Sequence, residues 1–184
     1  MKFLKGSVPA PINMDNIYIR KANLGDFDAV MQIYAQAREF MRKNGNPDQW
    51  GDYYPPAETV KEDLFENGGG YVVTDEKNIL AAFYFEQSAD DPTYREIFGG
   101  EWINDLPYGV VHRVGVGELG RGKGIGCLCL SWALSAAGNL KIDTHVKNLP
   151  MQRLLEKLGF VRCGSIYLED GSHRLAYQCV SKER

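Results

Sequence analysis

The stretch Arg113-Val-Gly-Val-Gly-Glu-Leu-Gly-Arg-Gly-Lys-Gly-Ile-Gly126 joins strand-like residues to a largely apolar segment. Six of the twelve residues 115–126 are glycine, and Arg121 and Lys123 add two positive charges. Glycines allow successive backbone N–H groups to turn toward one anion, and the N-terminus of a following helix adds a partial positive charge. The stretch therefore predicts a phosphate-binding loop between a strand and a helix.

The sequence on both sides of this loop predicts a mixed α/β chain. Apolar periodicity and turn residues predict strands over 17–21, 71–74, 79–86, 108–116, 140–144, 160–168 and 173–180. The same signals predict helices over 23–43, from Pro56 to the Gly68 triplet, over 124–137 and over 148–158. We expect residues 88–106 to be irregular, residues 1–16 to be an extended lead-in, and residues 17–184 to form a single domain.

Composition narrows the class of protein. The 184 residues are 44% hydrophobic and 24% charged, as in an ordinary soluble globular protein. A net charge of −3 argues against nucleic-acid binding, and no apolar run approaches the ~20 residues that span a bilayer. The four cysteines show no C-x-x-C spacing, which predicts free thiols and no metal site. We therefore expect a cytoplasmic protein without nucleic-acid or membrane partners.

Three interpretations of the loop lack supporting context. Gly115 to Gly120 spells the dinucleotide motif G-x-G-x-x-G, but the helix does not begin near the third glycine. Gly117 to Lys123 fits G-x-x-x-x-G-K, yet Gly124 stands where a P-loop needs Ser or Thr. A merely flexible hairpin loop is disfavoured because an apolar helix follows at once. The spelling around the first three glycines is therefore interpreted as accidental.

Arg121-Gly-Lys-Gly-Ile-Gly126 fits a further pattern, R/Q-x-x-G-x-G/A, directly between a strand and a helix. About twenty residues later come Asp143-Thr-His-Val-Lys-Asn148 and then Asn148-Leu-Pro-Met-Gln-Arg-Leu-Leu-Glu-Lys-Leu-Gly-Phe160. With these features the chain resembles the GNAT N-acetyltransferase superfamily over roughly 17–180. The resemblance implies the GNAT acyl-CoA N-acyltransferase fold, an α/β (α+β) architecture. Its central sheet is mixed and mostly antiparallel, with about six to seven strands and about four flanking helices.

The resemblance also implies acetyl-CoA as cosubstrate. The loop would hold its pyrophosphate, and backbone groups of the preceding strand would pair with its pantetheine arm. The implied binding residues are Val114, Val116, Arg121, Gly122, Lys123, Gly124, Ile125, Gly126 and Asn148. Asn148 has a second interpretation as a helix N-cap, with Pro150 in the first turn.

The candidate base is His112. It precedes Val116 by four residues on one strand, so we expect it on the same face as Val114 and Val116. Imidazole titrates near neutral pH, and some family members use a histidine at the matching position. The alternatives are a strand histidine that only hydrogen-bonds a neighbour, or His145 as the base.

The general acid is left open. The family often places a tyrosine seven residues after the asparagine, where this chain has Leu155. Either Tyr108 or Tyr167 protonates the sulfur, or the thiolate leaves unassisted, because a thiol pKa of about 8.5 makes it a tolerable leaving group.

The acceptor pocket is expected around residues 49–54. Trp50, Tyr53 and Tyr108 are the candidate acceptor-binding residues, through stacking or cation–π contact, and the alternative is that they only pack a loop onto the core.

The resulting hypothesis is acetyl transfer from acetyl-CoA to a small-molecule amine by direct attack in a ternary complex. A protein N-terminal or lysine acetyltransferase and a non-catalytic acyl-CoA sensor are the alternatives. The C-terminal strands leave room for a homodimer, and the acceptor's identity and the acyl-chain preference are left open.

Overall fold

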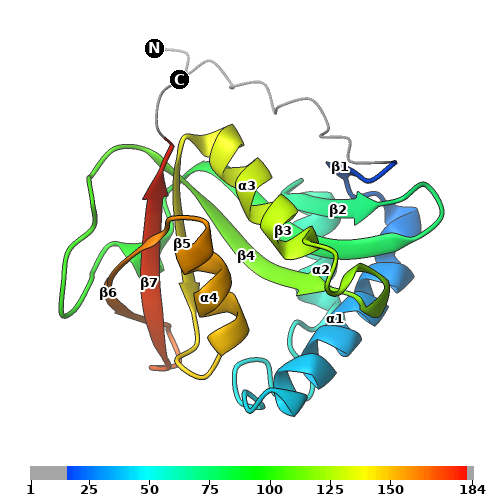
Figure 1. Ribbon diagram of the computed structural model, residues 1–184, viewed down its shortest axis with the longest axis horizontal. Helices are drawn as coiled ribbons and strands as arrows, with labels where there is room; N and C mark the ends of the chain where they lie inside the picture. Colours follow the sequence, from blue (N-terminus) through cyan, green and yellow to red (C-terminus); the bar gives the residue numbers. More distant parts are fainter. Residues whose placement is uncertain (1–15, 182–184) are drawn as a thin grey trace.

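The computed structural model describes residues 16–181 and forms one seven-stranded sheet (Figure 1). The strands are β1 (Tyr18–Lys21), β2 (Gly70–Thr74), β3 (Ile79–Ala89), β4 (Tyr108–Val116), β5 (Asn139–Thr144), β6 (Val161–Tyr167) and β7 (His173–Val180). Their spatial order is β1-β2-β3-β4-β5-β7-β6, and all neighbours pair antiparallel except β4 and β5. The predicted mixed, mostly antiparallel sheet is confirmed, whereas residues 1–15 of the expected lead-in lie outside the described residues.

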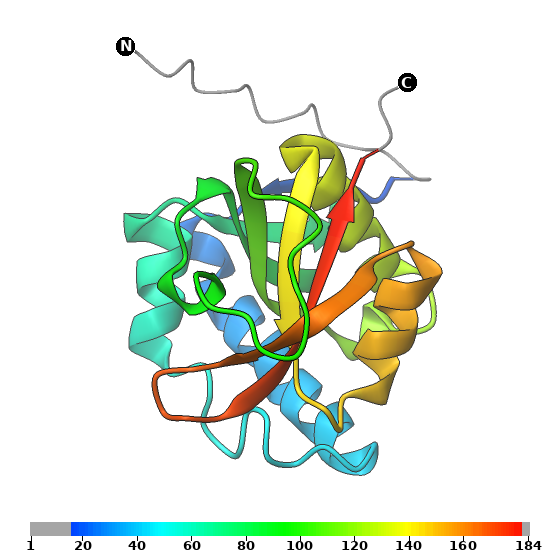
Figure 2. The ribbon, with the colours of Figure 1, turned by 90° about the vertical axis from the view of Figure 1, so that its left-hand side faces the viewer.

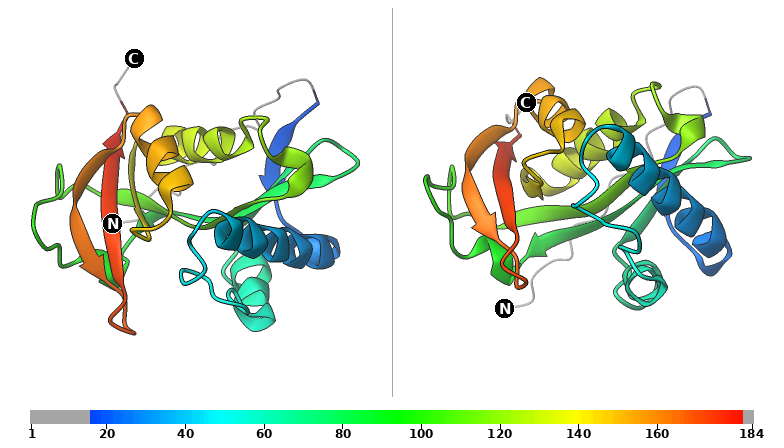
Figure 3. Two further views of the ribbon diagram at one scale, coloured as in Figure 1. Left: turned by 60° about the horizontal axis from the view of Figure 1, so that its bottom comes forward. Right: turned by 90° about the horizontal axis from the view of Figure 1, so that it is seen from below.

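Four α-helices flank the sheet among the described residues. They are α1 (Phe27–Lys43), α2 (Ala57–Lys61), α3 (Ile125–Ala137) and α4 (Leu149–Lys157). Shorter 3₁₀ or π turns are Leu24–Asp26, Glu62–Glu66, Pro92–Tyr94 and Glu118–Gly120. Figure 3 shows α1 and α2 on one side of the sheet and α3 and α4 on the other. None of these helices is both long and apolar enough to cross a bilayer.

The helix faces explain this layering. In α1, Val30, Ile33, Tyr34 and Ala37 are buried at the spacing of one helical stripe, and they pack with Val60 of α2. By contrast, most of α3 is apolar, and its buried residues form a larger core with the other face of the sheet. Burying both faces of a sheet in this way gives a three-layer α/β/α arrangement.

The two central strands separate toward their carboxyl ends. β4 and β5 pair only at Gly109–Leu140 and Val110–Lys141. Figure 1 shows them together where they begin and apart where they end. A parallel pair that stops after two residues leaves the later backbone groups of β4 without a neighbour on that side.

A β-bulge lies where β4 leaves β5. Arg113 has a φ of +53°, and the pairing with β3 shifts so that Arg113 and Val114 lie opposite Phe83 alone. A bulge of this kind adds one residue to a strand and leaves it unpaired. The non-glycine positive φ is the kind of strained backbone that clusters at functional sites.

The bulge makes one sequence expectation wrong. His112 and Gly115 pair with residues two apart on β3, so they share the face that α1 covers. Val114 and Val116 pack instead against the core beneath α3. His112 is therefore not on the face of Val114 and Val116, because the extra residue inverts the alternation of side chains.

The segment between β3 and β4 runs across the sheet to β6, which is the edge strand on the side away from β1. Strand β3 continues to Ala89, three residues beyond the predicted end, and a short turn at Pro92–Tyr94 follows. Figure 2 shows the remainder of the segment passing in front of the sheet toward β6, where Phe98 pairs with Ser165. This course brings Asp91 of the segment back against His112 of β4.

Candidate active site

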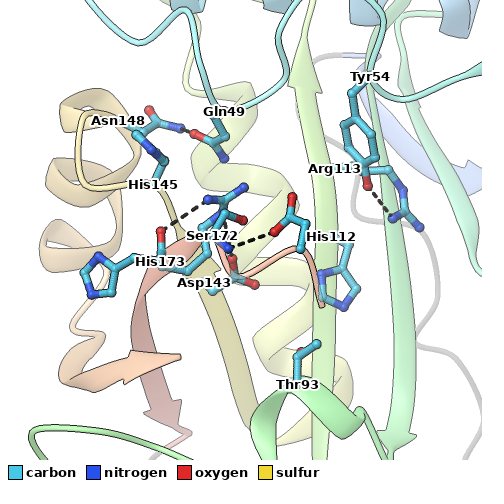
Figure 4. A network of polar contacts seen from close by, with 12 residues as sticks. Gln49, Tyr54, Thr93, His112, Arg113, Asp143, His145, Asn148, Ser172 and His173 are labelled. Atoms are coloured by element: carbon cyan, nitrogen blue, oxygen red, sulfur yellow. Dashed lines mark hydrogen bonds and ion pairs between the residues drawn. The ribbon is translucent and has the colours of Figure 1, made fainter. Parts of the chain in front are cut away.

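A cavity of about 560 Å³ opens where β4 and β5 separate. Its walls come from the loop at 48–54, from β4 and β5, from the start of α4 and from the turn between β6 and β7. Figure 4 shows the polar side chains around this space, with His112 on β4 and Asp143 on β5. The cavity therefore combines residues from nearly every part of the chain.

His112 forms an imidazole–carboxylate pair at the cavity wall. Its Nε2 lies 2.9 Å from Oδ2 of Asp91, and both residues line the cavity. The other carboxylate oxygen of Asp91 accepts hydrogen bonds from the backbone N–H and the hydroxyl of Thr93, at 2.9 and 2.6 Å. Asp91 is thus the N-cap of the short turn and also the anchor of the imidazole.

This pairing determines which imidazole nitrogen is free. Burial opposes ionisation of Asp91, but hydrogen bonds from His112 and Thr93 outweigh it and lower the pKa of the carboxyl to about 2. An ionised carboxylate only accepts hydrogen bonds, so Nε2 of His112 carries the proton. In the neutral imidazole, Nδ1 is therefore the nitrogen with a free lone pair.

A second polar group continues along the same face. The buried hydroxyl of Tyr94 donates to Oδ1 of Asp143 at 2.8 Å, and the ring of Tyr94 lies 6.1 Å from that of His112. Arg174 on β7 places its Nε 3.8 Å from Oδ2 of Asp143. A row of polar groups therefore crosses β4, β5 and β7.

The bulged residue Arg113 connects the cavity to the helices below it. It forms an ion pair with Asp63 at 2.5 Å and donates to the hydroxyl of Tyr54 at 3.1 Å. Burial raises the pKa of the Asp63 carboxyl despite this ion pair. These contacts hold the bulge, the turn at 62–66 and the cavity loop together.

Two contacts tie the loop at 48–54 to the start of α4. Asn148 donates from Nδ2 to Oε1 of Gln49 at 2.9 Å, which Figure 4 shows, and Lys147 pairs with Asp48 at 2.6 Å. Asn148 also caps α4, since its Oδ1 accepts from the N–H of Met151 at 3.3 Å. The predicted N-cap is confirmed, and Asn148 lines the cavity as well.

The glycine loop leaves an open space at the N-terminus of α3. Gly122 and Gly124 both have φ of +76°, and a Cβ on either would meet no atom within 4 Å. Among the described residues, no side chain caps this helix. The first helical hydrogen bond is the one from the N–H of Leu128 to the carbonyl of Gly124. The N–H of Lys123 donates to the carbonyl of Gly120 at 3.3 Å, whereas those of residues 124–127 have no acceptor within residues 16–181 and are free for an anion.

The earlier glycines of the loop have a different role. A Cβ on Gly117 would approach Cδ1 of Ile33 to 2.3 Å, and one on Gly120 would approach the carbonyl oxygen of Leu80 to 2.8 Å. Both positions need glycine because the strand end packs closely on α1 and β3. This packing explains the G-x-G-x-x-G spelling without a dinucleotide.

The two cations of the loop differ in their surroundings. The guanidinium of Arg121 reaches the carbonyls of Gln36 and Val116, both at 3.4 Å, and lies 4.6 Å from the ring of Phe40. Lys123 is exposed. Arg121 thus fastens the loop to α1 while keeping its charge near the open N-terminus.

The predicted acceptor residues are not all at the cavity. Trp50 lines it and packs edge-on against Tyr34, with ring centroids 5.6 Å apart. Tyr53 is 85% exposed and is not a lining residue, whereas its neighbour Tyr54 is. Tyr108 lies outside the cavity, with its ring 4.0 Å from Nζ of Lys141.

Two further predicted positions lie outside the cavity lining. His145 accepts a hydrogen bond from the N–H of Lys147 at 3.2 Å, and burial together with Arg174 lowers its pKa. Leu155 is 0% exposed in the core beneath α3. The position where the family often has a tyrosine is therefore a packing position in this chain.

Sequence reasoning missed the polar partners Asp91, Asp143 and Arg174. The dipeptide Asp91-Pro92 carried a signal for a helical N-cap, but nothing in it pointed to an imidazole 21 residues away. Asp143 and Arg174 meet only because β5 and β7 are neighbours in the sheet. No group of three or more His, Cys, Asp or Glu side chains within residues 16–181 is placed to hold a metal ion.

Comparisons with known proteins agree with this architecture. A GNAT-family acetyltransferase from Streptococcus agalactiae is 28% identical, with a TM-score of 0.81 over 91% of this chain and 96% of that one. A GNAT-family acetyltransferase from Listeria monocytogenes is 15% identical, with a TM-score of 0.66 over 94% and 100%. The protein yncA from Salmonella typhimurium, whose structure contains its cofactor acetyl-CoA, is 17% identical, with a TM-score of 0.61 over 92% and 96%.

Comparison with curated proteins gives no match. The family model described as the Acetyltransferase (GNAT) family matches residues 27–160. Because that match spans most of the chain and the fold agrees with it, this protein belongs to the acetyltransferase (GNAT) family.

Proposed function

We propose that this chain transfers an acetyl group from acetyl-CoA to the amine of a small molecule, by direct attack in a ternary complex. The observation that carries the proposal is the ordered pair of His112 and Asp91 inside the cavity opened by β4 and β5. An imidazole with one nitrogen hydrogen-bonded to a carboxylate and the other free suits deprotonation of an amine.

We further propose a cytoplasmic location, on the ground of the four unpaired cysteines.

The chain's own residues fit acetyl-CoA in three places. The free N–H groups of Gly122 and of residues 124–126, with the side chains of Arg121 and Lys123 beside them, suit a pyrophosphate. On the side toward β5, the backbone at Val114 and Val116 has no partner strand among the described residues and suits an extended amide arm, and Asn148 lies across the gap from it. Bound there, acetyl-CoA supplies a thioester carbon to the amine.

The proton of the amine goes to His112. Nδ1 accepts it, while Nε2–H stays bonded to Asp91, which stabilises the imidazolium that forms. Leu155 is buried, and neither Tyr108 nor Tyr167 is among the residues that line the cavity. We therefore propose that the thiolate leaves without a general acid, as its thiol pKa of about 8.5 permits.

The cavity supports a small acceptor over a protein chain. Gln49 and Asp48 bond to Asn148 and Lys147 across one side of the cavity, and these two contacts are the ground on which we propose a small acceptor in place of a long extended peptide. Trp50, with Tyr54 in place of the exposed Tyr53, supplies an aromatic wall. A protein acetyltransferase and a non-catalytic sensor are outcomes of the test below.

The test combines binding and turnover. We expect acetyl-CoA to bind in a calorimetric titration, and free thiol to appear steadily when a panel of amines, amino acids and peptides is added. His112→Ala should lower kcat about 10²–10⁴-fold. The rate of the natural sequence should fall at acid pH, where a base is protonated, and His112→Ala should remove that fall. The matched variant His145→Ala should leave kcat and the pH profile unchanged.

The other results discriminate between the alternatives. Binding without thiol release for any acceptor would identify a sensor, and release only with peptides would identify a protein acetyltransferase. If His145→Ala removed the fall in rate at acid pH and His112→Ala did not, the base would be His145. Absence of acetyl-CoA binding would refute the proposal entirely.

A further inference from the structure

Arg174 is a buried cation at the cavity with little of its hydrogen-bonding capacity in use. It is 8% exposed and lines the cavity. Within residues 16–181 it makes one hydrogen bond, from Nη1 to the carbonyl of His173 at 3.2 Å. A guanidinium has five N–H donors in a planar fork. Most of this donor set is therefore left for a ligand.

Asp143 balances the charge of Arg174 without using those donors. The shortest approach between them is 3.8 Å, which exceeds hydrogen-bond distance. Asp143 instead accepts from the hydroxyl of Tyr94 at 2.8 Å. Asp143 thus compensates the charge of the guanidinium without accepting a hydrogen bond from it, and buried donors left in that state favour an incoming acceptor.

The carboxylates around the cavity are already engaged. Asp48, Asp91 and Asp170 each accept a hydrogen bond from another residue at 2.9 Å or less. The guanidinium of Arg174 is therefore an unused donor group of the cavity, while Nδ1 of His112 is an unused acceptor. A planar, singly charged carboxylate matches the fork of Arg174, and the nearby Asp143 disfavours a doubly charged phosphate.

The position of Arg174 relative to His112 agrees with an α-amino acid. His112 lies two residues after Val110 on β4, and Asp143 lies two residues after its partner Lys141 on β5, so the two side chains are at the same level of the sheet. Arg174 on β7, the strand next to β5, approaches Asp143. In an amino acid, the carboxylate and the amine are separated by covalent bonds of about 1.5 Å each. With a hydrogen bond of about 3 Å at each end, an amino acid can join a guanidinium nitrogen to an imidazole nitrogen roughly 9 Å away. Strands two apart in a regular sheet are roughly 10 Å apart; the separation of β4 from β5 widens this span, and the side chain of Arg174 extends across part of it, as far as Asp143.

We propose that the acceptor is an amino acid, with its carboxylate on Arg174 and its amine at Nδ1 of His112. This inference rests on the proposed function, and it names the substrate class of that site. Arg174 would anchor the acceptor, and it would take no part in the proton transfer.

The test compares amino acids with the amines that lack only the α-carboxylate. Leucine, methionine, phenylalanine and glutamate are each paired with the decarboxylated amine, and thiol release from acetyl-CoA gives kcat/KM. A charge-assisted bidentate contact should favour the accepted amino acid about 10- to 100-fold. Equal or better turnover of the decarboxylated amines would overturn the inference and leave the N-acyltransferase intact, whereas no turnover of any amine would overturn both.

A variant pair locates the effect. Arg174→Gln should raise KM for the amino acid about 10- to 100-fold and leave kcat/KM for the decarboxylated amine unchanged. Arg162→Gln, an exposed arginine on the neighbouring strand β6, is the control and should change neither. An equal loss for both substrates in Arg174→Gln would show a structural role and overturn the assignment. If that variant does not fold, the comparison of substrates on the unmodified protein decides.

Discussion

Replacing Asp91 with asparagine should disable the proposed base while leaving the fold intact. The asparagine side chain has nearly the same shape, but its amide nitrogen donates where the carboxylate accepts. A donor facing Nε2 of His112 favours the imidazole tautomer with its proton on Nδ1, which is the nitrogen that must accept one. Asp91→Asn should therefore lose most of the about 10²–10⁴-fold that general base catalysis contributes.

The same substitution has a calculable effect on stability. The pKa of the Asp91 carboxyl is lowered from 3.8 to about 2 in the folded chain, which corresponds to about 2 kcal/mol. Because the folded-state pKa is the lower one, this stabilisation is present above about pH 4 and is lost as the pH falls toward 2. Asp91→Asn should thus be less stable than the natural sequence at pH 7 by up to this amount, with the difference shrinking in acid.

The assay measures thiol release across pH together with denaturant unfolding at pH 7 and pH 3. Asp90→Asn is the matched control, because the neighbouring carboxylate is exposed and its ion pair within residues 16–181 is with Arg95 at the surface. Its kcat should be unchanged and its stability within about 0.5 kcal/mol. If Asp91→Asn kept full kcat and an unaltered pH profile while folding normally, the argument that Asp91 orients His112 would be refuted.

Three other predictions, two of them with a matched pair of variants, test separate parts of the structure. Gly124→Ala and Gly138→Ala should both cost about 1–2 kcal/mol, since both residues have positive φ with open space around them. Only the first should weaken acetyl-CoA binding in calorimetry, and equal binding in both variants would remove the phosphate role of the loop. Leu155→Ala should destabilise the chain by about 2–5 kcal/mol in denaturant unfolding, as a fully buried leucine does; a neutral result would contradict its core position. Tyr54→Phe should change KM for the acceptor, because the hydroxyl holds Arg113 at the cavity, while Tyr53→Phe should not. Identical KM values in that pair would argue against an acceptor site at this loop.

Local patterns predicted the fold well because they carry local physics. The helix after Gly124 follows from a glycine-rich start and an apolar run, and Asn148 with Pro150 marks the next helix start at the correct residue. The strands flanking the loop were equally visible from their apolar residues. These features depend on neighbours in the chain, so they can be predicted from a single sequence.

The site was predicted less completely because it depends on contacts between distant segments. The bulge at Arg113 places the side chains after it on the opposite face of β4 from the one that simple alternation predicts, and no residue type in that strand indicates a bulge. Asp91 meets His112 only after the segment beyond β3 folds back against β4. Likewise, Tyr53 and Tyr54 are equivalent in sequence, and only the path of the loop turns one toward the cavity and the other toward solvent.

The most direct test of the central claim is the dependence of initial thiol-release rate on acceptor concentration at several fixed concentrations of acetyl-CoA. Direct attack in a ternary complex predicts that the reciprocal plots intersect, since both substrates must be bound in the cavity before His112 takes the proton. Parallel lines would indicate an acetylated protein and a two-step transfer. That result, or thiol release that does not depend on the acceptor, would contradict the account.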